Sequence, residues 1–132
     1  MKKLTLFLLM LIPTMGISQA KIGFNPSQIR EEFPNVEWNY QKWGENKDKL
    51  SMAFMNDEFL VNYLFDENNV SIITAIAPFK QGTLQAMIEL YNSKYVIINK
   101  NTWRFYDNGV VFICRLKAFD DGSFYFKWQE DK

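Results

Sequence analysis

The chain has 132 residues, 48% apolar and 17% aromatic, with 15 basic side chains, 15 acidic ones and no histidine. This length predicts one domain, since hydrophobic cores divide only in chains roughly twice as long, and the apolar content is too high for a disordered chain. Zero formal charge argues against an electrostatic nucleic-acid binder, and the absence of histidine excludes His-based triads and His-ligated zinc.

The first twenty residues have the pattern of a secretory signal peptide. Two lysines precede the apolar run 4–12, and small residues follow it. Because a bilayer span needs roughly 20 apolar residues, an N-terminal membrane anchor is the less favoured alternative. Cleavage after Ser18 or after Ala20 satisfies the preference for small residues. We therefore expect a mature domain of residues 21–132, periplasmic or secreted by a bacterial cell.

Loss of the signal peptide removes two lysines and leaves 13 basic against 15 acidic groups, a net charge of −2. Nothing in that balance attracts DNA or anionic lipid, and no apolar run after residue 20 is long enough to span a membrane. The single cysteine, Cys114, allows no internal disulfide and lies far from the cleavage site. The core alone must therefore hold the domain together.

The first helix is predicted from residue 26. Asn25 is placed as its N-cap, a proline follows at the first helical position, and Gln28 completes a capping box. Ile29 and Phe33 share one helical face, and the proline after Phe33 ends the helix.

Four apolar runs rich in strand formers follow this helix, and the segments between them are rich in turn residues. Their close spacing indicates antiparallel hairpins, because parallel crossovers need a dozen or more residues. The expected strands are 36–40, 50–55, 59–65 and 70–77.

A second helix is predicted to begin near Thr83, and a second set of strands follows it. One stripe of apolar residues at helical spacing marks the helix: Leu84, Met87, Ile88, Tyr91 and Tyr95. The expected strands are 95–99, 102–106, 110–116 and 124–128. The segments 107–109 and 120–122 have the sequences of hairpin turns, with glycine at the last position of each.

The order helix, meander, helix, meander predicts an α+β fold. The strands join into one antiparallel sheet with two helices on one face, and the other face stays open. We describe this as an αβββ-αβββ repeat, whose helices start 57 residues apart, near residues 26 and 83. The alternative is a cystatin-like or NTF2-like fold, in which one helix packs against a curved sheet.

The αβββ-αβββ order on a small exported chain resembles the β-lactamase-inhibitor-protein-like (BLIP-like) folds. The segment 23–33 is similar to the opening of small envelope proteins of the SmpA/OmlA type, in which a glycine precedes a capped helix. The matching positions are Gly23, Ile29 and Phe33. This chain departs from the lipoprotein family because it lacks the lipidated cysteine. The resemblance implies a protein-binding module of the cell envelope and implies no catalytic residues.

The acidic pairs fit turn chemistry better than catalysis. Adjacent carboxyls on a strand or turn point apart, so they do not form the converging dyad that glycosidases need. The segments 66–69 and 120–123 lack the alternate spacing of a calcium loop, so no metal site is expected. The pairs occupy positions 31–32, 57–58, 66–67, 120–121 and 130–131.

No nucleophile or cofactor motif is found in the sequence. Cys114 lies within an expected strand and has no histidine to act as its base, so we predict a small buried core residue. The chain also lacks a glycine-rich phosphate loop, a Cys-x-x-Cys pair and a Gly-x-Ser-x-Gly elbow. We therefore expect no cofactor and no enzymatic activity.

Aromatic residues are the one feature that points to a binding surface. By strand alternation, Trp38 and Tyr40 share one sheet face and Trp43 lies on the other, so both faces carry aromatics and only one can face the helices. Core filling is the alternative explanation for any one of them. We predict that the open face carries Tyr40, Trp43, Tyr63, Arg104 and Tyr106.

These observations favour a non-enzymatic exported module that binds another protein through its open sheet face. The partner would be an envelope protein, a secreted enzyme to be inhibited, or a toxin to be neutralised. The alternative is a carrier of a small apolar ligand. It requires a cavity between sheet and helix, lined by Phe59, Tyr63 and Phe112.

Overall fold

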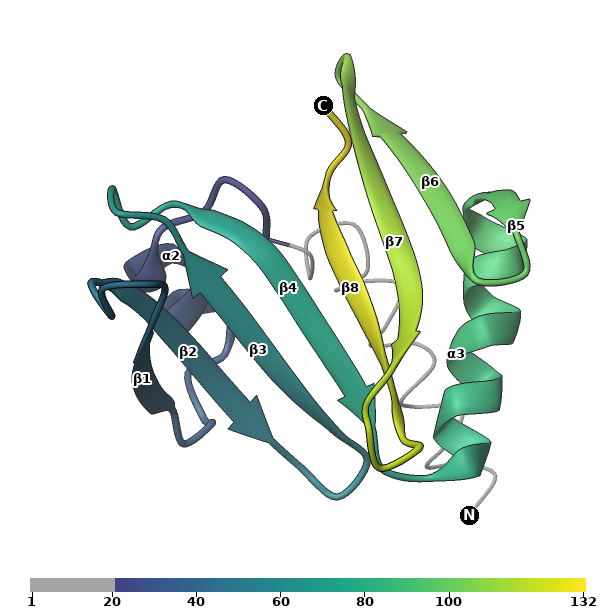
Figure 1. Ribbon diagram of the computed structural model, residues 1–132, viewed down its shortest axis with the longest axis horizontal. Coiled ribbons are helices and arrows are strands. Elements are labelled where there is room, and N and C mark those ends of the chain that lie inside the picture. Colours follow the sequence, from purple (N-terminus) through teal and green to yellow (C-terminus); the bar gives the residue numbers. More distant parts are fainter. Residues whose placement is uncertain (1–20) are drawn as a thin grey trace.

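The computed structural model describes residues 21–132, so the expected signal peptide lies outside the described residues. The described chain is α+β, with one eight-stranded antiparallel sheet and two helices (Figure 1). In chain order the elements are α2 (Pro26–Glu32), β1 (Asn39–Trp43), β2 (Lys49–Met55), β3 (Phe59–Phe65), β4 (Ser71–Pro78), α3 (Gln81–Lys94), β5 (Val96–Asn99), β6 (Thr102–Asp107), β7 (Val110–Ala118) and β8 (Phe124–Glu130).

The predicted capping box begins helix α2. The Asn25 Oδ1 atom accepts a hydrogen bond from the Gln28 backbone N–H, and Gln28 Oε1 accepts one from the Asn25 N–H, both at 2.9 Å. These two bonds satisfy donors that the first helical turn leaves free. Ile29 is fully buried beneath the helix, and Phe33 is its C-cap.

The first turn of helix α3 is tied to another element through side chains. Its N-cap residue, Lys80, makes no side-chain capping bond. Instead Glu58, in the turn between β2 and β3, accepts hydrogen bonds from the Thr83 hydroxyl and the Lys80 ammonium. The bond from Thr83, supported by Lys80, lowers the pKa of Glu58. Within residues 21–132, neither helix is long and apolar enough to cross a membrane.

The sheet consists of two meanders joined at its centre. The strand order is β1-β2-β3-β4-β8-β7-β6-β5, so β4 pairs with β8 between the two halves. That junction runs from the pair Ile73–Gln129 to the pair Ile76–Phe126. Four strands follow each described helix, as many as the eight expected strands give, so the order is αββββ-αββββ and the description as αβββ-αβββ is one strand short in each half. The internal repeat itself stays a prediction.

Seven of the expected strands match β2 to β8 to within two residues at either end, but the first does not. We expected it at 36–40, whereas β1 pairs with β2 only from Asn39 to Trp43. Trp38 precedes the strand because its ring packs into the core instead, with its centroid 6.2 Å from that of Phe33 and 5.2 Å from that of Phe54.

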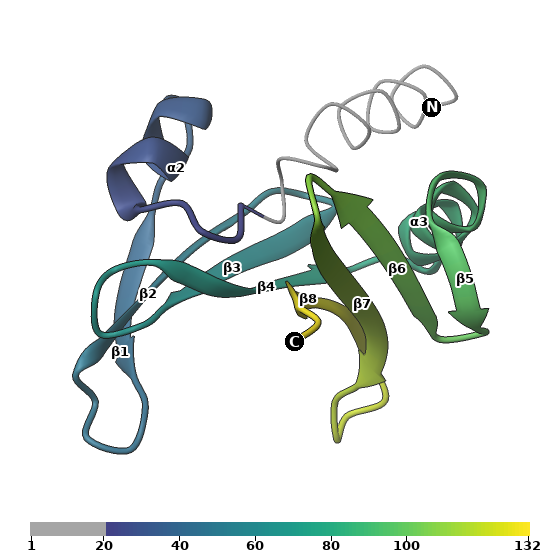
Figure 2. The same ribbon diagram turned by 90° about the horizontal axis from the view of Figure 1, so that it is seen from above.

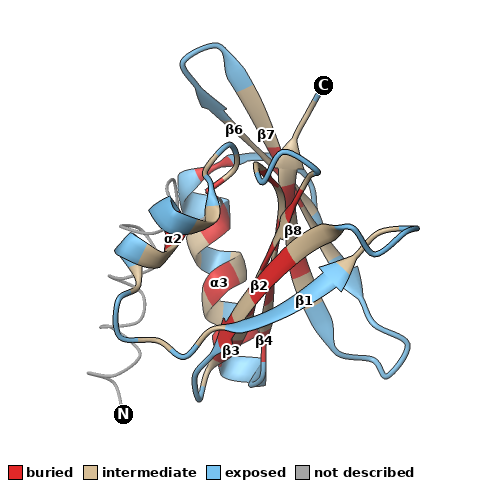
Figure 3. Ribbon diagram, turned by 90° about the vertical axis from the view of Figure 1, so that its left-hand side faces the viewer, coloured by how far each residue is buried: buried red, intermediate tan, exposed pale blue. Residues whose placement is uncertain are grey.

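Both helices lie on one side of the sheet, as predicted (Figures 2 and 3). The β1–β2 turn and the β7–β8 turn extend toward the other side. Ring contacts fix the covered face: Phe33, at the end of α2, packs 5.1 Å from Phe54, and Tyr91 of α3 packs on residues of β6 and β8. Neither helix covers the opposite face.

Tyr91 lies at the centre of the core beneath α3. Its ring centroid is 4.9–5.6 Å from those of four other aromatic residues, and its hydroxyl accepts a hydrogen bond from an indole N–H at 3.4 Å. Cys114 is fully buried nearby, as predicted, and burial raises the pKa of its thiol. The four rings around Tyr91 are Tyr95, Trp103, Phe126 and Trp128.

Candidate docking face of the sheet

The face turned away from the helices, here called the open face, is defined by rows of paired residues that cross the sheet. Strand alternation places these rows opposite the buried core residues. Two of these rows contain one residue from each of the eight strands. From β1 to β5, the first is Asn39, Ala53, Asn62, Ala75, Lys127, Arg115, Thr102 and Asn99, and the second is Gln41, Ser51, Leu64, Ile73, Gln129, Ile113, Arg104 and Val96.

The structure divides the five predicted binding residues between the two faces. Trp43, Arg104 and Tyr106 lie on the open face, as expected. Tyr40 and Tyr63 were expected there, but they pair with Met52 and lie on the helix-covered face. Tyr63 is fully buried, whereas Tyr40 is 47% exposed because β1 is an edge strand.

The three remaining residues do not form one patch. Trp43 is on β1 and Tyr106 is on β6, at opposite ends of the strand order. The Trp43 indole is held in place, since its Nε1–H donates to the backbone oxygens of Leu50 and Phe65 at 2.9 and 3.1 Å. Tyr106 is 54% exposed and hydrogen-bonds to Arg104, which raises the pKa of that guanidinium.

Three basic side chains gather on the open face of β7 and β8. Arg115 stands directly opposite Lys127, and Lys117 follows Arg115 two residues further along β7. Burial lowers the pKa of Lys127, and the charges of Lys117 and Arg115 lower it further. We call Arg115, Lys117 and Lys127 the basic triad.

The basic triad cannot be recognised in the sequence alone, because its members are spread over two strands. Alternation along β7 indicates that Arg115 and Lys117 share a face with each other, but no local pattern says which residue of β8 lies beside them. The hairpin turn at 120–122 was the available signal. Its pairing sets the β7–β8 register and so brings Lys127 opposite Arg115.

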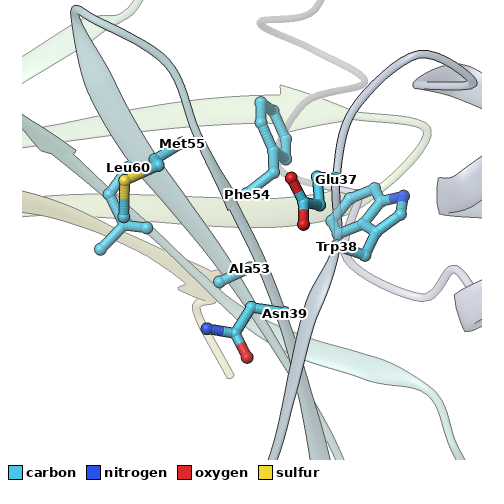
Figure 4. Close-up of a pocket in the computed structure, with 7 residues that line it drawn as sticks. All are labelled: Glu37, Trp38, Asn39, Ala53, Phe54, Met55 and Leu60. Atoms are coloured by element: carbon cyan, nitrogen blue, oxygen red, sulfur yellow. The ribbon is translucent and has the colours of Figure 1, made fainter.

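The other half of the open face is apolar and built from small side chains. Ala53, Ala75 and Ala77 are partly exposed there, and Met55 is 66% exposed. A hollow of about 370 Å³ opens beside them, with Met55 and Leu60 on one side (Figure 4). The hollow is lined by Glu37, Trp38, Asn39, Ala53, Phe54, Met55 and Leu60.

A second hollow, of about 380 Å³, lies where β4 begins and β8 ends. Ile73 and Gln129 line it from the second row, and the segment before α2 forms another wall. That segment is tied to β4, because the Gly23 N–H donates to the Ser71 oxygen and the Ser71 N–H donates to the Phe24 oxygen. Each hollow is lined by residues from both faces of the sheet, such as Phe54 with Met55 in the first and Glu130 with Gln129 in the second.

The buried hydroxyl of Tyr63 gives a test of the corrected placement. It has no hydrogen-bond partner among the described residues, and a buried unsatisfied group costs stability. We expect Tyr63→Phe to raise the free energy of unfolding by about 1 kcal/mol, measured by urea denaturation.

Tyr91→Phe is the matched control for that substitution. It removes a hydroxyl that accepts a hydrogen bond from Trp128 Nε1, so it should lower the free energy of unfolding by about 1 kcal/mol. If the two substitutions change the free energy of unfolding equally, the two hydroxyls do not differ in hydrogen bonding as the structure indicates.

Within residues 21–132, no group of three or more Cys, Asp or Glu side chains is placed to hold a metal ion. In comparisons with known proteins, no family model matches the chain, and neither a curated protein nor a solved structure matches it. The function is therefore inferred from the residues of the open face alone.

Proposed function

We propose that this chain is an exported, non-enzymatic module that binds a protein partner through the open face of its sheet. The observation that carries the proposal is that both helices pack on one face and none packs on the other, where fourteen of the sixteen residues in the two rows are at least partly exposed and only Ser51 and Ile113 are buried. Partly exposed Leu64, Ile73 and Ala75 lie in those rows. Uncovered apolar surface rimmed by polar residues is typical of interaction sites.

The dimensions of the face suit a macromolecule. Eight strands about 4.8 Å apart give a surface about 33 Å across. The patch of about 800 Å² that each partner contributes to a typical complex has a similar width of about 30 Å. The carrier alternative gains no support from the contacts beneath α3. Its Tyr91 ring packs directly on Phe126 and Trp128 there, where a ligand cavity would have to lie.

Site-specific photo-cross-linking in the envelope of the source bacterium tests this proposal. The photoreactive residue p-benzoylphenylalanine replaces Tyr106 or Gln41, two exposed positions on the open face, in separate variants. We expect both variants to form an adduct with the same protein.

The matched control carries the same probe at Glu89, an exposed position on α3. This variant should form no such adduct, because α3 lies on the other side of the sheet. Protein adducts from position 89 alone, or from none of the three positions, would overturn the proposal.

A further inference from the structure

The charges of this protein are segregated by face, although they cancel in the whole sequence. Every ionisable Lys, Arg, Asp or Glu side chain at an open-face strand position is basic: Lys49, Arg104, Arg115, Lys117 and Lys127. Of these, Arg104 is paired with Asp131, just beyond β8, at 3.3 Å. The open face therefore carries a positive charge that the formal net charge of zero conceals.

The basic triad lacks internal compensation. No ion pair within the described chain includes Arg115, Lys117 or Lys127. Like charges directly opposite each other on neighbouring strands destabilise a sheet, and Arg115 and Lys127 occupy such positions. Burial and the two neighbouring cations lower the pKa of Lys127. A bound anionic group would relieve this repulsion.

The surroundings of the triad favour a short acidic segment over a long polyanion. The β7–β8 turn extends toward the open side and carries the exposed residues Asp120 and Asp121. The β1–β2 turn extends to the same side and is of mixed charge, with the exposed residues Glu45, Lys47 and Asp48. The two carboxylates of the β7–β8 turn, between the strands that carry the triad, would repel a long nucleic acid or an anionic membrane.

An apolar surface adjoins the triad. Ala75 is paired with Lys127 across the β4–β8 junction, and Ile73 and Leu64 lie in the neighbouring row. A ligand that places carboxylates on the triad would therefore place its adjacent side chains over small and aliphatic residues. Protein segments supply this combination of carboxylate and aliphatic groups, whereas nucleic acids do not.

We infer that the partner presents an acidic protein segment, whose carboxylates bind Arg115, Lys117 and Lys127 while its aliphatic side chains cover Ala75 and Ile73. This inference rests on the proposed function and names the chemistry of the partner. Complementary charge of this kind raises association rates and excludes partners of like charge.

Selection from a random 12-residue peptide library displayed on phage tests the inference on residues 21–132. We expect the selected peptides to be enriched in Asp and Glu next to aliphatic residues. Synthetic versions should bind more weakly as salt increases, because salt screens exposed charges.

A double variant, Lys117→Gln with Lys127→Gln, should weaken binding of these peptides more than about tenfold. The matched control, Lys42→Gln with Lys100→Gln, loses the same charge at exposed positions outside the open face and should bind as the wild type does. All variants must first show the wild-type midpoint of urea unfolding. Equal weakening by both double variants would overturn the inference.

Two blocking variants separate failure of the inference from failure of the proposed function. Ala75→Trp and Leu64→Arg each place a bulky side chain on the open face. If the selected peptides are not enriched in Asp and Glu, and both blocking variants abolish their binding, the inference of an acidic partner is wrong but the proposed docking face stands. If neither variant changes peptide binding, or if no peptides are selected, both the inference and the proposed function are wrong. The protein is also tested with a 12-nucleotide DNA strand and with phosphatidylglycerol vesicles. If either binds more strongly than the peptides do, and if this binding depends on Lys127, the partner is not an acidic protein segment and the inference is wrong.

Discussion

Replacing Tyr91 by alanine is expected to lower the free energy of unfolding by about 3–5 kcal/mol, the range found for large aromatic residues in cores. Tyr91 is fully buried, and its ring contacts four aromatic rings, which come from the C-cap of α3, from β6 and from β8. The alanine variant leaves a cavity among rigid rings that have few ways to collapse into it. A typical domain has only about 5–15 kcal/mol of stability in total.

Urea denaturation followed by far-ultraviolet circular dichroism measures this effect. Tyr106→Ala is the matched control, because it removes the same side chain from a position that is 54% exposed. Its effect should stay within about 0.5 kcal/mol, as for most surface substitutions. A loss of stability in Tyr91→Ala as small as that of the control would show that α3 does not pack on the sheet through this residue.

The local elements of this fold could be predicted because each is specified by neighbouring residues. Asn25 and Gln28 form the predicted capping box. The β6–β7 hairpin turns at Asn108 and Gly109, both of which have positive φ, as two-residue turns of this kind require. The apolar stripe of the second helix correctly indicated that Tyr91 faces the core.

Contacts between distant segments could not be predicted in the same way. The β4–β8 pairing joins strands that are separated by α3 and three other strands, so no turn sets its register. The face assignment of Tyr40 was wrong for a local reason, because alternation along the strand already places Tyr40 and Trp43 on opposite faces. The face of Tyr63 depends on the partner strands, since Tyr63 pairs with the buried Met52. For the same reason, the positive charge on the open face became visible only once the register across all eight strands was known.

Ala75→Pro is expected to prevent stable folding, because it breaks the sheet at its centre. Ala75 lies on β4 and is paired on both sides, with Asn62 of β3 and Lys127 of β8. Proline removes a backbone N–H from the ladder and is found essentially only on edge strands or at bulges. By analogy with proline inside a helix, we expect the free energy of unfolding to fall by about 3 kcal/mol or more. The measurement is the loss of cooperative thermal unfolding in circular dichroism.

The edge strand β5 provides the matched control. Ile98→Pro places proline where the register with β6 already shifts, between Ile97 and Asn99, and β5 has a partner on one side only. This variant should remain folded, with a free energy of unfolding within about 1 kcal/mol of the wild type, as for an average substitution. Cooperative unfolding of Ala75→Pro near the wild-type temperature would contradict the pairing of β4 with β8.

The two proline variants should also differ in ligand binding, because only Ala75→Pro disturbs the β4–β8 junction. Both rows of the open face cross the β4–β8 junction, through the pairs Ala75–Lys127 and Ile73–Gln129. The apolar half of the face comes from the first meander and the basic triad from the second, so only an intact junction places them side by side. A variant that weakens this junction should therefore lose affinity for acidic peptides together with stability, whereas Ile98→Pro should keep both.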